Sequence, residues 1–235
     1  ALDRGIAISR RYEEAACEPA ADKPCAAISA AQLGKDVRVR LTVVAVHSHR
    51  IRPGDTTVVD GLPTVTRDIA AVTAAAACSP EWAVAVLDAV AWQRPDATAE
   101  LRAIVDRWPW LRGVGTVRGA LGLVRPGAQS PFESLSRVRL MGHGLPEPRL
   151  QVPFHDAAGL IGYADMTWDG WGVIGECDGL AKYVDRDDLV REKIREDRLR
   201  ALGFVVVRWT WHELMNDSAA VASRIVRARA VARRQ

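Results

Sequence analysis

Residues 160–183 read LIGYADMTWDGWGVIGECDGLAKY and contain a strong short-range hairpin signal, the dipeptide Asp169-Gly170. An Asp-Gly pair suits a two-residue turn in which both central residues have positive φ, and β-prone residues flank it on either side. With a two-residue loop, Trp168 lies opposite Trp171. The stretch therefore predicts an antiparallel β-hairpin.

This register gathers three carboxylates on one face of the hairpin. It places Asp165 opposite Ile174, and two residues further out Tyr163 lies opposite Glu176. Because side chains alternate along a strand and paired residues share a face, Asp165, Glu176 and Asp178 point the same way. As diagonal neighbours, Asp165 and Glu176 are expected to bring their oxygens within about 6 Å of each other.

The acidic face has two interpretations. Antiparallel sheets often have one solvated face, on which acids are ordinary. Here the acids follow an apolar run containing Val173 and Ile174, and like charges beside a buried strand are costly unless a cation compensates them. Oxygen ligands with few nitrogens or thiols nearby favour Mg²⁺ or Mn²⁺ over Zn²⁺. The second interpretation is therefore a divalent-metal site formed by Asp165, Glu176 and Asp178.

About the last hundred residues carry further features in a specific order. Along the chain these are Ser130-Pro131-Phe132-Glu133 at a helix start, a Gly-Leu-Pro-x-Pro link (144–148), Gln151, Asp165, Glu176-x-Asp178-Gly179-x-x-Lys182, a charged helix from Arg191 to Leu202, and a strand from Phe204 to Trp211 that carries Arg208. This arrangement resembles the PD-(D/E)XK nucleases, in the branch of very-short-patch-repair-like endonucleases. The resemblance implies a restriction-endonuclease-like mixed sheet flanked by helices, and a Mg²⁺-dependent endonuclease or nickase that hydrolyses phosphodiester bonds in DNA.

The resemblance also implies catalytic residues, namely Asp165, Glu176, Asp178, Lys182 and Glu133. Asp165 and Glu176 are expected to hold Mg²⁺ or Mn²⁺, with Asp178 as a further ligand or a group that orients water. Lys182 is expected to stabilise charge on the attacked phosphate, because a lysine ammonium is a compact charge that can also lose a proton.

Two positions depart from the family's pattern. The motif has a lysine two residues after the glutamate, where this chain has Asp178, and this branch more often has a histidine where this chain has Lys182. Asp178 supports a different function, a non-catalytic DNA-binding antitoxin or regulator that keeps the nuclease fold. Glu133 also has two interpretations, because the sequence from Ser130 to Glu133 is a capping box in which the glutamate accepts a bond from the Ser130 amide.

Positive charge is unevenly distributed, although the net charge is only +3 and the pI 8.8. Arg208 is expected to contact phosphate or to anchor the acid cluster. Lys193 is a candidate DNA contact, but Asp197 at i+4 equally fits a solvated ion pair. Arg224 and Arg227 belong to a terminal segment without acids, which fits either a helix along a phosphate backbone or a solvated helix face.

The fold class expected is α/β, with a nuclease-like domain over residues 126–235 and a smaller α+β region of unclear role over residues 1–125. Periodicity and breakers predict strands at 37–46, 56–59 and 63–65, helices at 66–78, 80–92, 98–107 and 111–124, and then a helix at 187–202 and a strand at 204–210.

Composition and residue patterns argue against several other classes of protein. No run of 18 apolar residues occurs, and the first residues do not read as a signal peptide. The four cysteines form no CxxC pair, so free thiols are expected. We therefore expect a soluble cytoplasmic protein with no membrane partner. DNA is the expected partner, and RNA and a homodimer are left open.

Overall fold

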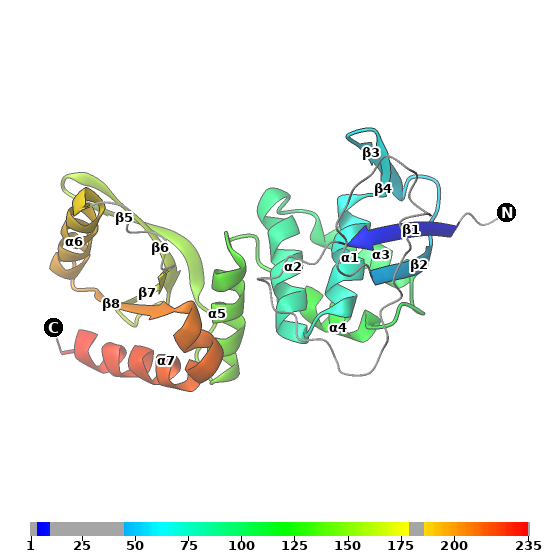
Figure 1. Ribbon diagram of the computed structural model, residues 1–235. Helices are drawn as coiled ribbons and strands as arrows, with labels where there is room; N and C mark the ends of the chain where they lie inside the picture. The colour runs from blue at the N-terminus through cyan, green and yellow to red at the C-terminus, as the bar shows by residue number, and fades with distance from the viewer. Residues whose placement is uncertain (1–3, 10–44, 179–185, 235) are drawn as a thin grey trace.

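The computed structural model describes residues 4–9, 45–178 and 186–234. The elements upstream of residue 125 are two antiparallel strand pairs and four helices (Figure 1). They are β1 (Arg4–Ser9), β2 (Ala45–Arg50), β3 (Thr56–Val59), β4 (Leu62–Val65), α1 (Arg67–Ala77), α2 (Pro80–Gln93), α3 (Thr98–Arg107) and α4 (Val114–Leu121).

The remaining elements build one four-stranded mixed sheet with helices around it. They are α5 (Pro131–Gly142), β5 (Arg149–Asp156), β6 (Gly159–Thr167), β7 (Val173–Asp178), α6 (Arg186–Ala201), β8 (Val205–Thr210) and α7 (Trp211–Ala232). The strand order is β5-β6-β7-β8, in which β5, β6 and β7 pair antiparallel and β7 pairs parallel with β8. The parallel pair requires a crossover connection, which α6 provides.

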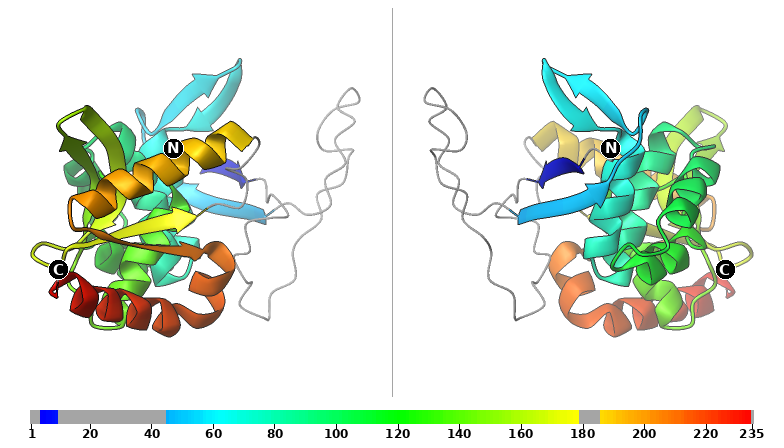
Figure 2. Two further views of the ribbon diagram at one scale, coloured as in Figure 1. Left: turned by 90° about the vertical axis from the view of Figure 1, so that its left-hand side faces the viewer. Right: turned by 90° about the vertical axis from the view of Figure 1, so that its right-hand side faces the viewer.

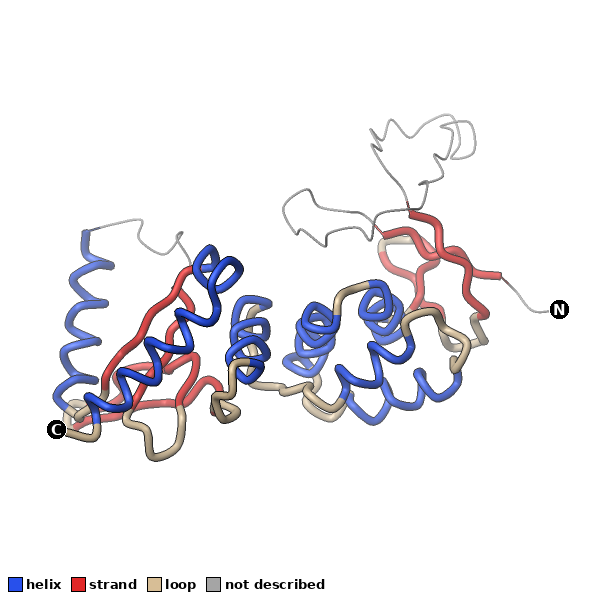
Figure 3. Tube along the Cα trace, turned by 90° about the horizontal axis from the view of Figure 1, so that it is seen from below, coloured by secondary structure: helices blue, strands red, loops and turns tan. Residues whose placement is uncertain are grey.

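The sheet lies between helices, as Figure 3 shows along the Cα trace. On one face, Leu199 of α6 packs in a small cluster with Ile174 of β7. On the other face, α5 and α7 pack on the sheet through a larger cluster that includes Val173, Trp209 and Ile225. Successive residues of β7 therefore face opposite helices, as the alternation of side chains along a strand requires.

Local sequence explains where these elements begin and how closely they pack. Thr210 and Glu213 form a complete capping box at the start of α7. The turn between β3 and β4 uses Asp60 and Gly61, both with positive φ, as a two-residue hairpin loop requires. Gly175 has to lack a side chain, because a Cβ there would lie 2.6 Å from the Trp209 ring.

The two halves of the chain have separate hydrophobic cores that meet where α2 packs on α5 (Figures 1 and 2). Arg137 of α5 is fully buried at this junction. Its Nη2 donates to Asp88 Oδ2 of α2 at 3.0 Å and to the Leu123 carbonyl at 2.6 Å, and its Nη1 donates to Glu147 Oε1 at 3.1 Å. A buried guanidinium needs such partners, because leaving it unpaired in the interior is strongly unfavourable.

The α/β class and the mixed sheet flanked by helices are confirmed, as are the helix and strand that follow the hairpin. The strand expected at 37–46 falls mostly outside the described residues, and β2 begins at Ala45. The helix expected at 111–124 is shorter, because Gly113 adopts positive φ and α4 begins only at Val114. The boundary at residue 125 stays a prediction. No helix among the described residues is long and apolar enough to cross a membrane.

Candidate functional site

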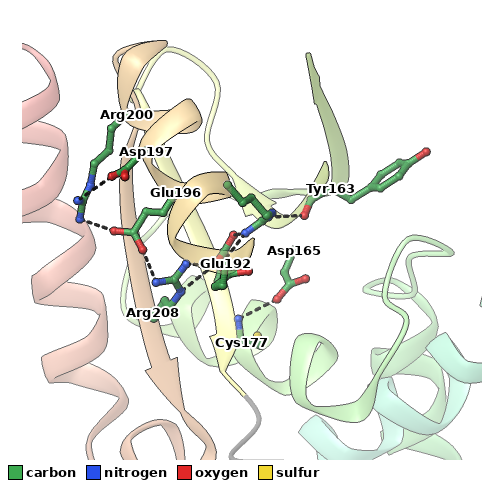
Figure 4. Close-up of polar contacts among 10 residues, drawn as sticks. Tyr163, Asp165, Cys177, Glu192, Glu196, Asp197, Arg200 and Arg208 are labelled. Atoms are coloured by element: carbon green, nitrogen blue, oxygen red, sulfur yellow. Dashed lines mark hydrogen bonds and ion pairs between the residues drawn. The ribbon is translucent and has the colours of Figure 1, made fainter. Parts of the chain in front are cut away.

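A pocket of about 580 Å³ opens between α6 and the sheet face that carries the predicted acids. Its lining includes Asp165, Glu176 and Asp178, which the sequence placed on one face, and also Arg208. Arg191, Arg195 and Arg198 enter it from α6, and Ile161, Tyr163, Cys177, Glu192 and Ile194 complete the lining. Figure 4 shows Asp165 directed at Cys177, with Arg208 and Glu192 from the neighbouring elements close by.

The predicted hairpin exists, but its two-residue turn and its register were wrong. The pairs are Met166 with Gly175 and Thr167 with Ile174, so the register is shifted by two residues. Continued by one residue beyond these pairs, it sets Asp165 opposite Glu176 rather than Ile174. The turn is longer because Gly172 adopts positive φ besides Gly170. A shift of two residues leaves every side chain on its predicted face.

Asp165 is held by hydrogen bonds to two neighbouring strands. Its Oδ2 accepts the Cys177 backbone N–H of β7 at 2.8 Å, and its Oδ1 accepts a bond from the side-chain amide of Gln151 on β5 at 3.2 Å. The carboxylate is half-buried in the pocket wall. Its two oxygens are therefore fixed in direction before any ligand arrives.

Glu133 lies behind Asp165 at the start of α5 rather than in the pocket lining. It does not complete the expected capping box. Its Oε2 accepts the Gln129 N–H at 3.0 Å in place of the Ser130 N–H, and its Oε1 accepts the Ser130 hydroxyl at 2.8 Å. The same Oε2 accepts a second bond from the Gln151 amide at 3.0 Å. Glu133 thus reaches Asp165 through one intervening side chain.

Glu176 is buried and lies between two arginines. Its Oε2 accepts a hydrogen bond from Arg208 Nε at 3.0 Å, and its Oε1 lies 2.6 Å from Arg195 Nη1. Although Oε1 is within ion-pair distance of Arg195, it accepts no hydrogen bond of good geometry from the described part of the chain. Charge compensation at this carboxylate therefore comes from guanidinium groups.

Arg208 extends this cluster across the pocket to α6. Its Nη2 donates to Glu192 Oε1 at 2.5 Å, and its Nη1 donates to Glu196 (Figure 4). Burial alone lowers the pKa of the Arg208 guanidinium, but the charges of Glu176, Glu196 and Glu192 outweigh burial and raise the pKa above its ordinary value. Of the two roles expected for Arg208, the structure has the residue anchoring the acids.

A divalent cation requires several donor atoms close together. Among the described residues, no group of three or more His, Cys, Asp or Glu side chains lies close enough to hold a metal. Mg²⁺, however, usually keeps several waters and takes only one or two protein carboxylates together with substrate phosphates. Asp165 and Glu176, level on adjacent strands and lining one pocket, fit that smaller donor set.

The other residues expected at the site differ in their surroundings. Lys182 lies outside the described residues. Lys193 on α6 and Arg227 on α7 are exposed. Arg224 donates to Glu213 Oε1 at 2.5 Å and to the Arg208 carbonyl at 3.1 Å, and so connects α7 to β8.

Sequence reasoning missed two residues of the site. Gln151 belongs to the ordered features of the last hundred residues, but nothing in its sequence context indicates that it bridges two acids. Arg195 had a usable signal, because Arg191, Arg195 and Arg198 recur at helical spacing and so fall on one side of α6.

Comparisons with known proteins identify relatives whose activity is not assigned. The chain is 28% identical over 145 residues to two uncharacterised proteins, MT2308 and Rv2248, from two strains of Mycobacterium tuberculosis. The match covers 62% of this chain, and the chain spans about half, 54%, of the length of each relative. No family model and no solved structure matches the chain.

Proposed function

We propose that this protein is a metal-dependent DNA endonuclease or nickase that hydrolyses phosphodiester bonds with Mg²⁺ or Mn²⁺. The observation that carries the proposal is the position of Asp165 and Glu176. They lie level on adjacent strands of a mixed sheet and open into a pocket lined by four arginines. The order of elements, a helix, three antiparallel strands, a helix and a parallel strand, agrees with the fold that the sequence resemblance implies.

In this proposal, each residue of the site has a separate role. Asp165 and Glu176 hold the cation, and Asp178 orients water. When bound, the cation lowers the pKa of a water molecule and neutralises charge that develops on the phosphate. Lys182 stabilises the charge of the attacked phosphate. Arg191 and Arg195 lie at the pocket and draw a polyanion toward an otherwise acidic centre.

A cleavage assay on the whole chain tests the proposal. Duplex, nicked, mismatched and single-stranded DNA, and RNA, are incubated with Mg²⁺, Mn²⁺ or EDTA. We expect cation-dependent cleavage by the natural sequence and at least about 100-fold slower cleavage by Glu176→Gln, because one transition-state charge interaction is lost. Asp197→Asn is the matched control, since Asp197 is an exposed acid on α6 outside the pocket lining. Equal cleavage by Glu176→Gln and the natural sequence overturns the proposal.

A second candidate function is favoured by a specific observation. Glu176 is already neutralised by Arg195 and Arg208, and Asp178 occupies the place where the resembled motif has its lysine. This combination suits a DNA-binding antitoxin or regulator that keeps the fold without the chemistry. That function predicts that duplex DNA is retarded equally with Mn²⁺ and with EDTA, and that no substrate is cut.

A further inference from the structure

Gln151 has a backbone conformation that its position in a strand does not explain. Among the described residues other than glycine, only Asp60 and Gln151 have positive φ, 50° in both cases. Asp60 belongs to a tight hairpin turn, where this conformation is ordinary. Gln151 lies inside β5, between Leu150, which pairs with Met166, and Val152, which pairs with Ala164. A long side chain is strained at such a φ, and strain of this kind persists only where surrounding contacts impose it.

The contacts that impose it are two hydrogen bonds from one amide group. Gln151 Nε2 donates to Glu133 Oε2 at 3.0 Å and to Asp165 Oδ1 at 3.2 Å. A primary amide nitrogen carries two N–H groups, so it can serve two carboxylates at once, and neither carboxylate has to be protonated. Both acceptors also identify this end of the side chain as the nitrogen.

Glu133 is itself anchored, so the bridge has a fixed end. Its two oxygens accept bonds from the Gln129 N–H and the Ser130 hydroxyl at the start of α5. Asp165 is the other end, and its remaining oxygen accepts the Cys177 N–H. Gln151 therefore connects the rigid start of a helix to the acid that opens into the pocket.

We infer that Gln151 is a positioning residue, whose amide links Glu133 to Asp165 and orients the Asp165 carboxylate for a divalent cation. This inference rests on the proposed function for the cation, but the orientation of Asp165 can be measured without metal. Groups that hydrogen-bond to a metal ligand typically change metal affinity by about 10- to 100-fold when they are removed.

Two substitutions distinguish the effect of losing the amide hydrogen bonds from the effect of relieving the strained backbone. Gln151→Gly accepts positive φ without strain and removes both hydrogen bonds. Gln151→Asn also tolerates positive φ and keeps the amide, but it is one methylene too short to span both acids. Asp60→Gly is the matched control, because it relieves positive φ in the β3–β4 turn away from the pocket.

The first measurement is hydrogen exchange of the Cys177 backbone amide in the metal-free protein by NMR. We expect exchange to accelerate by about tenfold or more in Gln151→Gly and Gln151→Asn, because the Asp165 carboxylate loses the hydrogen bond from Gln151. We expect no acceleration in Asp60→Gly. An unchanged Cys177 exchange rate in both Gln151 variants overturns the inference.

The second measurement is a calorimetric titration with Mn²⁺ alone. We expect the dissociation constant to rise by about tenfold or more in both Gln151 variants and to stay unchanged in Asp60→Gly. Equal Mn²⁺ affinity in Gln151→Gly and the natural sequence overturns the role toward the cation. If the natural sequence itself binds no Mn²⁺, the proposed metal site is wrong, and Cys177 exchange alone then supports or overturns the positioning of Asp165.

Discussion

Arg195 is the described residue whose charge competes most directly with a cation at the pocket. Its Nη1 lies 2.6 Å from Glu176 Oε1, and its Nη2 donates to the Tyr163 carbonyl at 2.8 Å. A cation that binds to Glu176 on this side has to displace the guanidinium or share the carboxylate with it. If the proposed cation binds at Glu176, Arg195 is therefore expected to weaken its binding, while in the metal-free protein it compensates the charge of the buried acid.

We expect Arg195→Ala to tighten Mn²⁺ binding by roughly fivefold, since a partly solvated ion pair contributes up to about 1 kcal/mol. Calorimetry on the metal-free protein measures the change. Arg198→Ala is the control, because Arg198 lies on the same helix but pairs with Asp156 instead of Glu176. Weaker Mn²⁺ binding in Arg195→Ala would mean that the arginine supports the cation rather than competing with it.

At the scale of elements, α6 is held on the sheet mainly by charge. The helix is strongly polar, and Leu199 is its buried residue among those whose side chains are described. A helix of this kind depends on ion pairs rather than on an apolar stripe. Arg208 of β8 supplies two of them, to Glu192 and Glu196 of α6, and Arg195 of α6 pairs with Glu176 of β7.

We expect Arg208→Met to lower the free energy of unfolding by about 2 kcal/mol, because three carboxylates lose a charged donor at once. The loss should concentrate in α6 and appear as faster hydrogen exchange there than in α7. Arg200→Met, at the exposed end of α6, is the control and should change stability by less than about 0.5 kcal/mol. Equal stabilities for the two variants would show that the Arg208 cluster contributes nothing to the docking of α6.

Titration at acid pH tests a second contact of α6, the ion pair between Arg198 and Asp156 of β5. Hydrogen bonds from Arg198 lower the pKa of Asp156 to about 2, although burial opposes the shift. Because the folded pKa is depressed, the stabilisation is complete above the unfolded value of about 3.9 and is lost as the pH falls toward 2. NMR titration should therefore place the Asp156 midpoint near 2, and Arg198→Gln should return it toward 4. A midpoint near 4 in the natural sequence would contradict the Arg198–Asp156 contact.

The sequence predicted the helices and strands around the site better than it predicted the contacts within the site. Turn residues and periodicity predicted the hairpin, the helix after it and the following strand, because these signals are local. The length of the turn was not predictable, because it depends on Gly172, whose carbonyl accepts the Val205 N–H of a distant strand. The arginine partners of Glu176 come from α6 and β8, 19 and 32 residues away, as the numbers of Arg195 and Arg208 give. No periodic pattern specifies such tertiary ion pairs.

For the whole molecule, the Arg137–Asp88 pair is a fully buried contact between the helices that join the two hydrophobic cores. Both side chains have 0% exposure, and they belong to α5 and α2 respectively. Removing one partner leaves a buried charge uncompensated, whereas replacing both with apolar residues of similar volume removes the problem together with the pair. The junction is therefore expected to respond very differently to single and double substitution.

We expect Asp88→Leu to lower the free energy of unfolding by about 3–5 kcal/mol, and Asp88→Leu with Arg137→Met to recover most of that loss. Urea unfolding followed by tryptophan fluorescence and by circular dichroism measures both values and shows whether the two cores unfold together. A double variant as unstable as the single one would mean that the loss comes from other groups that the substitutions leave unpaired, such as the Leu123 carbonyl and the Arg125 N–H, rather than from the unpaired guanidinium.

We propose that Asp165 and Glu176 together bind a divalent cation, and calorimetric titration of the metal-free full chain with Mn²⁺ tests this most directly. Asp165→Asn removes the charge but keeps an oxygen to accept the Cys177 N–H, so the fold should survive, which circular dichroism checks. We expect saturable binding of one Mn²⁺ by the natural sequence and by the control Asp197→Asn, and no measurable binding by Asp165→Asn. No binding by the natural sequence, or equal binding by Asp165→Asn, would contradict the claim.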